Sequence, residues 1–228
     1  MANQDQWCFA WFTPRSELIP QAALVKAARW APGSIIRVSF LDGDPVVQKK
    51  VQDVAEAWTG PSMANLTLKF LDDGSPGDVR ISFKYDGSWS VIGTDCQTLS
   101  IDQPTMNYGW LDQETAGDEL RRVVLHEFGH ALGLIHEHQN PGGEIKWNRD
   151  QVIQDLSGPP NNWSLDAIDH NMFEPYSADL TNYTAVDPTS IMMYPIPAKW
   201  TLDGFSAGLN IDLSATDRQF IHEQYPFD

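Results

Sequence analysis

The chain of 228 residues is short of cysteine, of basic residues and of long apolar runs. It has two cysteines, Cys8 and Cys96, and neither belongs to a C-x-x-C pair, which disfavours a zinc site made of thiolates. It has 15 Lys and Arg against 31 Asp and Glu, a formal net charge of −16. This balance argues against nucleic acid or an anionic membrane as a partner, because both require basic patches. We interpret the acidity as a solubility feature; calcium binding near Asp72, Asp73 and Asp78 is a weaker alternative.

No apolar run approaches the roughly 20 residues that a membrane-spanning helix needs. Residues 1–11 lack the basic and apolar regions of a signal peptide, so either the protein is made without one or the chain begins after it. The hydrophobic fraction of 42% is that of a globular protein, and the length suffices for one large domain or two small ones.

The stretch from His126 to His136 reads H-E-x-x-H-x-x-G-x-x-H. On a helix, His126 and His130 lie one turn apart on one face, and Glu127 projects beside them, where it can act as a general base. Gly133 is suited to end the helix in a left-handed conformation, so that the chain turns and brings His136 to the same point. Three protein ligands leave one position of a tetrahedral zinc ion open for water, which is the arrangement of a catalytic site.

Two other interpretations of these histidines are disfavoured. A helix with histidines satisfied in a core does not require the glycine and the third histidine, which add two fixed positions to the spacing. A structural zinc site requires a fourth ligand, and the nearest candidate, His138, is interpreted as a residue at the rim of the site. His170 and His222 are interpreted as surface or loop histidines.

Alternation and β-branched residues predict five strands, over residues 34–41, 65–71, 79–84, 96–101 and 105–111, with 87–93 as loop. Helices are predicted near residues 21–30, from Asp44 and Pro45 to about 60, through the histidine motif, over 148–156, and from 214 to about 224. Thr115-x-x-Asp118 and Ser214-x-x-Asp217 resemble capping boxes at the start of two of these helices.

These elements predict an α+β fold: a mixed sheet of about five strands, a central helix, and an irregular C-terminal part that ends in a helix. We divide the chain into an N-terminal leader or wrapping segment, residues 1–33, and a single catalytic domain, 34–228. The domain has an N-terminal lobe, 34–133, and a C-terminal lobe, 134–228, with the metal in the cleft between them.

The motif resembles that of the metzincin zinc peptidases, and the surrounding sequence is most similar to the astacin family. Residues 136–139, H-E-H-Q, are close to the H-E-H or H-E-Q that begins at the third ligand of astacins. Residues 190–194, S-I-M-M-Y, resemble the astacin Met-turn S-x-M-H-Y, and residues 213–217 with Tyr225 resemble the closing helix. The similarity covers roughly residues 34–225.

The resemblance implies a zinc-dependent endopeptidase with Glu127 as the catalytic base. It places one catalytic zinc ion on three ligands: His126, His130 and His136. Met192 would support the ligands by packing beneath the metal. Tyr194 would donate a hydrogen bond to the transition state, with a core or rim tyrosine as the alternative. The substrate would lie extended along a sheet edge near residues 97–101. We expect a secreted or extracellular monomer, and a zinc-bearing, peptide-binding pseudoprotease is the alternative function.

The chain departs from the astacin pattern in three places. Met193 replaces the histidine of the Met-turn, and two cysteines replace the usual four. Glu137 matches the glutamate that contacts the mature N-terminus through water, but here residues 1–33 precede the domain. For Cys8 and Cys96 three alternatives stay open: a disulfide, two free thiols, or a latency switch in which the Cys8 thiolate occupies the open zinc position.

Overall fold

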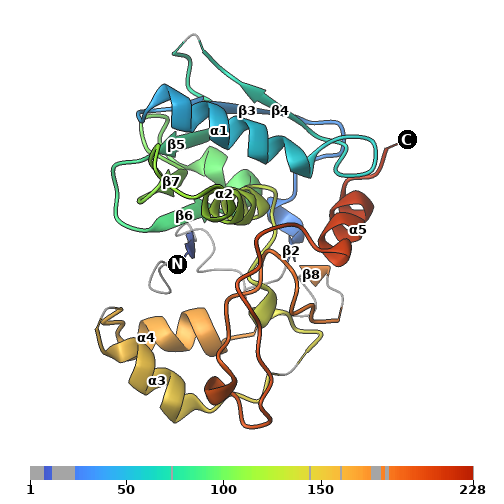
Figure 1. The fold of residues 1–228 in the computed structure, drawn as a ribbon. Coiled ribbons are helices and arrows are strands. Elements are labelled where there is room, and N and C mark those ends of the chain that lie inside the picture. Colours follow the sequence, from blue (N-terminus) through green and yellow to red (C-terminus); the bar gives the residue numbers. More distant parts are fainter. Residues whose placement is uncertain are drawn as a thin grey trace.

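The described residues of the computed structural model are 8–11, 24–72, 74–143, 145–159, 161–175, 181–182 and 185–227. They form a six-stranded sheet in the order β1-β6-β7-β5-β3-β4 (Figure 1). Every neighbouring pair is parallel except β6 with β7. The strands are β1 Cys8–Trp11, β3 Ile35–Phe40, β4 Thr67–Phe70, β5 Val79–Ser82, β6 Ser88–Val91 and β7 Met106–Tyr108. A small antiparallel sheet joins β2 Leu24–Val25 to β8 Thr181–Asn182.

The predicted α+β fold with a mixed sheet is confirmed, and β1 adds a strand from within residues 1–33. Strands β3, β4, β5 and β7 lie inside predicted ranges. Two predictions between residues 87 and 101 are wrong. Residues 88–91, predicted as loop, form β6, and a 3-10 helix, η4 Gly93–Thr98, replaces the strand predicted at 96–101. The four residues of β6 are too few for their alternation to stand out, and pairing with β1 and β7 makes them a strand.

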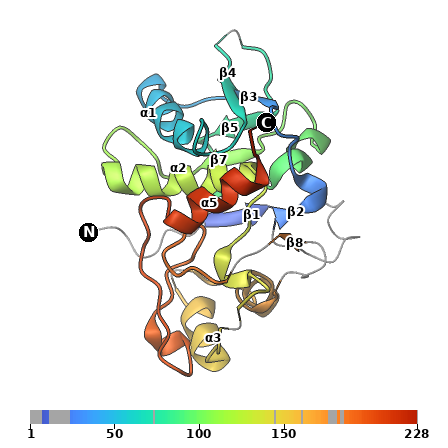
Figure 2. The same cartoon turned by 90° about the vertical axis from the view of Figure 1, so that its right-hand side faces the viewer.

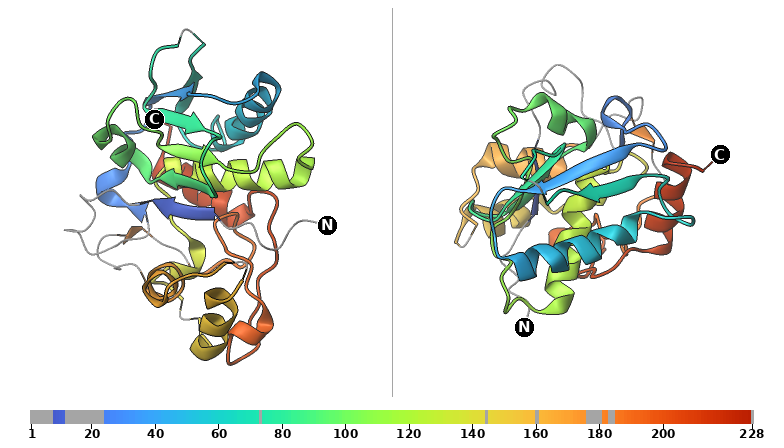
Figure 3. Two further views of the ribbon diagram at one scale, coloured as in Figure 1. Left: turned by 90° about the vertical axis from the view of Figure 1, so that its left-hand side faces the viewer. Right: turned by 90° about the horizontal axis from the view of Figure 1, so that it is seen from above.

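The prediction of a strand edge for the substrate near residues 97–101 is also wrong, because none of these residues lies in a strand. The antiparallel strand of the sheet is β6, and its outer side pairs with β1 in parallel register, from Cys8 with Ser88 to Trp11 with Val91. The N-terminal strand therefore lies along the edge that β6 would otherwise expose (Figure 3).

Helix α1, Pro45–Ala55, begins where the sequence predicts. The Asp44 side chain accepts a hydrogen bond from the Val46 amide at 2.8 Å, and Pro45 occupies the first turn, where no amide donor is needed. The short η3, Glu56–Trp58, continues the helix to Trp58. The buried side of α1 carries residues at helical spacing: Val47, Val51 and Ala55.

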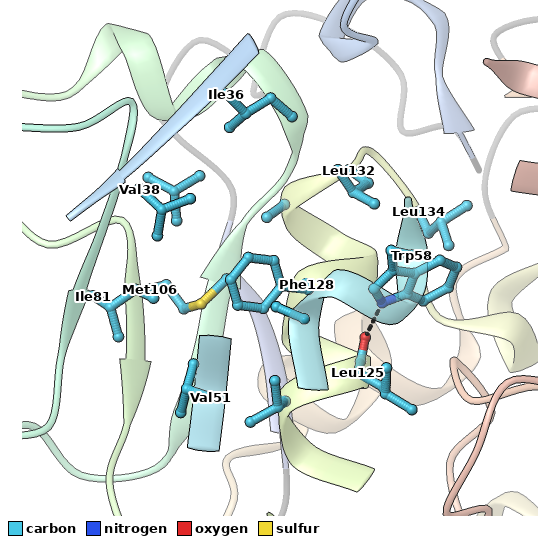
Figure 4. Close-up of a cluster of buried hydrophobic side chains, with 14 of the residues drawn as sticks. Ile36, Val38, Val51, Trp58, Ile81, Met106, Leu125, Phe128, Leu132 and Leu134 are labelled. Atoms are coloured by element: carbon cyan, nitrogen blue, oxygen red, sulfur yellow. Dashed lines mark hydrogen bonds between the residues drawn. The ribbon is translucent and has the colours of Figure 1, made fainter. Parts of the chain in front are cut away.

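Helix α2, Gly117–Ala131, runs through the centre of the molecule, and every residue from Arg122 to Ala131 is buried. Trp58 closes one side of α2 by donating its indole N–H to the Leu125 carbonyl at 2.9 Å (Figure 4). Trp30 donates to the Ala131 carbonyl at 2.9 Å. This burial agrees with the prediction of a largely buried helix at the centre of the molecule.

The start of α2 differs from the prediction. Its N-cap is Ala116, which makes no side-chain capping bond. The Thr115 hydroxyl instead takes part in a turn with Asp112, at 3.0 Å from its carboxylate and 2.9 Å from its amide. The local turn thus competes successfully for the side chain that the capping box requires.

After α2 the chain builds a second layer, which lies below the sheet in Figure 1. It contains η5 Glu137–Gln139, α3 Arg149–Ser157, α4 Leu165–Ile168, the π-helical turn η6 Asp169–Phe173 and η8 Ala198–Trp200. Its apolar side chains form a separate buried cluster. The predicted helix at 148–156 is confirmed as α3, whereas α4 and η6 were not predicted. The lobe boundary at residue 133 stays a prediction.

The C-terminal helix α5, Ala215–Gln224, returns to the first layer (Figure 2). Its predicted capping box is confirmed, because Ser214 Oγ accepts from the Asp217 amide and the Asp217 carboxylate accepts from the Ser214 amide. Tyr225, at its end, donates its hydroxyl to the Leu132 carbonyl at 2.7 Å. Of the helix predicted near residues 21–30, the structure shows the turn η2, Lys26–Ala28, and residues 21–23 lie outside the described part. None of the helices described is both long and apolar enough to cross a bilayer.

Asp78, just before β5, ties two strands together. Its carboxylate accepts from the Arg37 amide, Nε and Nη2 at 3.0 to 3.1 Å and from Gln97 at 3.3 Å. Burial by itself would raise the pKa of Asp78, but these hydrogen bonds and the Arg37 charge outweigh burial and hold that pKa below its ordinary value of 3.8. Asp78 is thus engaged by Arg37 and Gln97, Asp73 lies outside the described residues, and the calcium alternative stays a prediction.

We predict that Asp78→Asn lowers the free energy of unfolding at pH 7 and that its difference from wild type shrinks in acid. A carboxyl whose pKa is lowered in the folded state stabilises the fold above its unfolded pKa, and this contribution is lost as the pH falls through the folded pKa. Urea unfolding at pH 7 and at pH values below 3.8 measures both effects. Asp72→Asn, at an exposed carboxylate nearby, should show no such difference; an Asp78→Asn deficit independent of pH would contradict the prediction.

Candidate active site

The end of α2 brings the three histidines of the motif together. Gly133 has φ of +97°, the left-handed conformation that glycine adopts without strain. The Gly133 amide donates to the His130 carbonyl at 2.8 Å, and the Leu134 amide donates to the Gly129 carbonyl at 2.9 Å, which is the Schellman pattern. The chain therefore leaves the helix at the predicted residue and returns His136 toward the helix.

The histidine ring nitrogens converge on one point. One ring nitrogen from each of His126, His130 and His136 lies within 4.8 Å of the others, and this is the metal-competent cluster found among the described residues. His130 Nε2 and His136 Nε2 are 3.2 Å apart. Two ligands on a tetrahedral zinc ion, at bonds of about 2.0–2.1 Å, would be about 3.3 Å apart, so the spacing of this pair fits zinc.

Hydrogen bonds on the far side of the rings orient them for this task. Nδ1 of His126 is 2.8 Å from the Ile191 carbonyl, and Nδ1 of His130 is 2.9 Å from the Leu134 carbonyl. Because a carbonyl only accepts, each Nδ1 carries the proton and each Nε2 offers a lone pair. His126 Nε2 is buried without a hydrogen-bond partner, which is the polar atom that a bound cation would satisfy.

The rings are also in the protonation state that binds metal. Burial lowers the pKa of His130 to about 4. Burial, with the charge of neighbouring histidines as a smaller cause, lowers the pKa of His126 and His136 well below the ordinary value of 6.5. All three imidazoles are therefore neutral near pH 7, as ligands must be. Glu127 lies between the first two ligands in sequence on the same helix and is fully buried.

The segment 190–194 passes beneath this cluster. Met192 is buried against α2, and a Cβ built on Gly129 would lie 2.4 Å from its Sδ. The turn is held by Asp217 of α5, whose carboxylate accepts from Ser190 Oγ at 2.6 Å and from the Ile191 amide at 2.8 Å. The Ile191 carbonyl in turn accepts a hydrogen bond from His126 Nδ1. The C-terminal helix therefore supports a zinc ligand through two successive hydrogen bonds, from Asp217 to Ile191 and from Ile191 to His126.

The chain is 42% identical to the solved structure of myroilysin. The two match with a TM-score of 0.86 over 90% of this chain and 99% of the myroilysin chain. It belongs to the metzincin zinc proteases. A second crystal structure of myroilysin is 38% identical, with a TM-score of 0.70 over 98% of this chain and 92% of that one. The predicted astacin-like resemblance and the three-histidine site for a catalytic zinc ion are thereby confirmed.

Two further comparisons give a more distant relative in sequence and a shared fold. Zinc metalloproteinase nas-30 of Caenorhabditis elegans is 27% identical over 152 residues, 65% of this chain, and the match spans 18% of nas-30. High choriolytic enzyme 1, a hatching enzyme zinc-protease from Oryzias latipes, shares the fold with a TM-score of 0.57 at 17% identity, over 89% of this chain and 96% of its own. No family model matches the sequence.

In this metzincin, Tyr194 lies over the ligands. It is buried, and its ring centroid is 4.2 Å from that of His136 and 6.2 Å from that of His126. Tyr194 is therefore buried beside the histidine cluster and not at a rim, and the choice between a role in the transition state and that of a core tyrosine stays a prediction. Met193, the departure from the family's histidine, is buried in the second apolar cluster and does not reach the rim.

Glu137 is engaged within the chain. Its Oε1 accepts from the Asp187 amide and from Asn140 Nδ2, both at 3.0 Å, and burial raises its pKa to about 7. These two donors bind the carboxylate that in astacins faces the mature N-terminus. His170 pairs with Glu174 and His222 with the Met63 carbonyl, so neither reaches the zinc site.

Cys96 is a free, buried thiol, and burial raises its pKa to about 12. The structure therefore does not contain the Cys8–Cys96 disulfide, and Cys96 is protonated and unreactive. The backbone of Cys8 belongs to β1, but its side chain lies outside the described residues, so the latency hypothesis stays a prediction.

We predict that Gly129→Ala impairs zinc binding about tenfold, because the added methyl displaces Met192 beneath the ligands. Alanine by itself favours a helix over glycine by about 1 kcal/mol, so a loss cannot come from helix propensity. Competition with a chromogenic chelator measures the zinc affinity. Gly117→Ala, at the open start of the same helix, is the matched control and should bind zinc as wild type does. Unchanged affinity in Gly129→Ala would refute the packing argument.

Proposed function

We propose that this metzincin hydrolyses internal peptide bonds of proteins, with Glu127 as the general base. The observation that carries the proposal is the convergence of three neutral, buried histidine nitrogens, together with a buried carboxylate, Glu127, on the helix that carries two of these histidines. Such a donor set satisfies three positions of a tetrahedral ion and leaves one for a reacting group. When bound, zinc lowers the pKa of a coordinated water and polarises a carbonyl oxygen.

The residues of the chain then supply the proton transfers. Glu127 accepts a proton from the attacking water on a carboxylate oxygen and passes it to the nitrogen of the leaving amine. Tyr194 donates a hydrogen bond from its phenolic O–H to the oxyanion that develops on the scissile carbonyl. Met192 packs beneath the ligands and keeps their rings in place without binding the ion.

We infer further that the substrate binds in an extended form along β6, the antiparallel strand of the sheet. In the structure β1 pairs with this strand, so a substrate strand and β1 compete for the same backbone donors and acceptors. Residues 8–11 would then have to leave β6 before cleavage, and Cys8 within β1 is the candidate latency ligand. We infer as well that the protein is secreted and acts as a monomer.

We predict that Glu127→Gln retains the three-histidine zinc site and loses peptide hydrolysis by at least about 10²-fold, because the amide cannot accept the proton of the attacking water. Metal analysis and casein cleavage on the same sample test both halves. Chelation should abolish wild-type activity and added zinc should restore it. Full activity in Glu127→Gln would remove Glu127 from the mechanism, and a wild type that binds zinc and peptide without cleaving would favour a pseudoprotease.

We predict that Cys8→Ser raises the activity of the full chain if the Cys8 thiolate holds the enzyme latent, since a hydroxyl is a far weaker zinc ligand. The initial rate of cleavage of a fluorogenic peptide is the measurement. Cys96→Ser, at the buried thiol, is the matched control and should leave the rate unchanged. Equal rates for wild type and Cys8→Ser would exclude the latency switch while leaving the peptidase proposal intact.

A further inference from the structure

Tyr194 is part of a compact group of three rings. His138 lies 4.6 Å from Tyr194 between centroids, with the ring planes only 26° apart, so the two rings stack. His136, the third ligand, is 4.2 Å from Tyr194 and 5.4 Å from His138. The tyrosine that covers the zinc site is therefore packed against a ligand on one side and a non-ligand histidine on another.

His138 is also fixed by contacts with residues other than Tyr194 and His136. Its Nε2 is 2.7 Å from the Asn171 carbonyl in η6, so Nε2 carries the proton and donates. Trp147 meets its ring edge-on, at 6.2 Å and 89°, and Phe173 meets Trp147 at 5.7 Å and 69°. Arg149 stacks over Phe173 at 4.0 Å and closes this series of rings at the surface. His138 itself is 5% exposed, so it forms a fixed wall of the Tyr194 site.

We propose that His138 is a positioning residue that sets the place of the Tyr194 ring through stacking. The inference rests on the role proposed above for Tyr194. A hydroxyl that stabilises an oxyanion has to lie about 3 Å from it, and a misplacement of about 1 Å costs on the order of 10²-fold in rate. His138 can hold the Tyr194 ring in place because it is itself hydrogen-bonded to η6. Through this contact the second layer of the fold bears on the reaction.

A double-mutant cycle on kcat tests the proposal. Tyr194→Phe should lower kcat about 10²-fold, because one oxyanion donor is removed. His138→Ala should lower kcat about 10–100-fold with little change in KM, because the tyrosine loses its support while substrate binding is kept. The double variant should be no slower than Tyr194→Phe, since a misplaced ring without its hydroxyl has nothing further to lose.

Three controls separate stacking from general damage. His138→Phe keeps a ring against Tyr194, loses the bond to Asn171, and should recover most of the rate. His138→Gln keeps a donor and loses the ring, so it should behave as His138→Ala and replaces it in the cycle if the alanine variant does not fold. His170→Ala removes an exposed histidine from the same η6 turn and should match wild type. Zinc content is measured for every variant.

The outcomes distinguish the two proposals. If Tyr194→Phe is slow and the two defects multiply in the double variant, His138 does not act through Tyr194, while the role of Tyr194 stands. If His138→Phe is as slow as His138→Ala, stacking is not the means of positioning and the inference fails. If Tyr194→Phe is fully active, the proposed role of Tyr194 falls and the positioning role of His138 falls with it.

Discussion

The structure depends on bringing three neutral imidazoles to one point inside the protein. Each ring is buried, and two of them hold a proton on the side turned away from the metal. The remaining lone pairs face one another across distances that suit a cation. Without a cation, a buried acceptor such as His126 Nε2 has no hydrogen-bond partner, which is costly. The surrounding fold therefore has to hold the three rings in this arrangement.

Several distant segments supply that restraint. The Schellman turn at Gly133 sets the position of His136 relative to α2. The Met-turn carbonyl of Ile191 orients His126, and Asp217 on the last helix fixes the Met-turn. Asp217 is buried, and burial raises its pKa above the ordinary value although three hydrogen bonds oppose that shift. The same residue thus caps α5 and supports the metal site.

Strand β6, which the sequence did not predict, bears on the proposed binding of substrate. β6 is short and was not predicted, and it is the antiparallel strand of the sheet and packs against α2. β1 pairs with the outer side of β6, whose backbone donors and acceptors would otherwise be open to other chains. The second layer contributes in a different way, because η6 anchors His138 and through it the ring over the zinc ligands.

The sequence alone was sufficient for features set by local spacing. The H-E-x-x-H helix, the break at Gly133, the Asp44 and Ser214 caps and the third ligand all follow from periodicity and backbone preference within a few residues, and the structure contains each of them. Only the tertiary structure decided the rest. β6 became a strand through its partners, Thr115 was diverted into a turn, and Cys96 was buried away from any disulfide. The place of His138 beside Tyr194 was likewise settled there, because it depends on a carbonyl 33 residues along the chain, and contacts at such separation leave no pattern in the sequence.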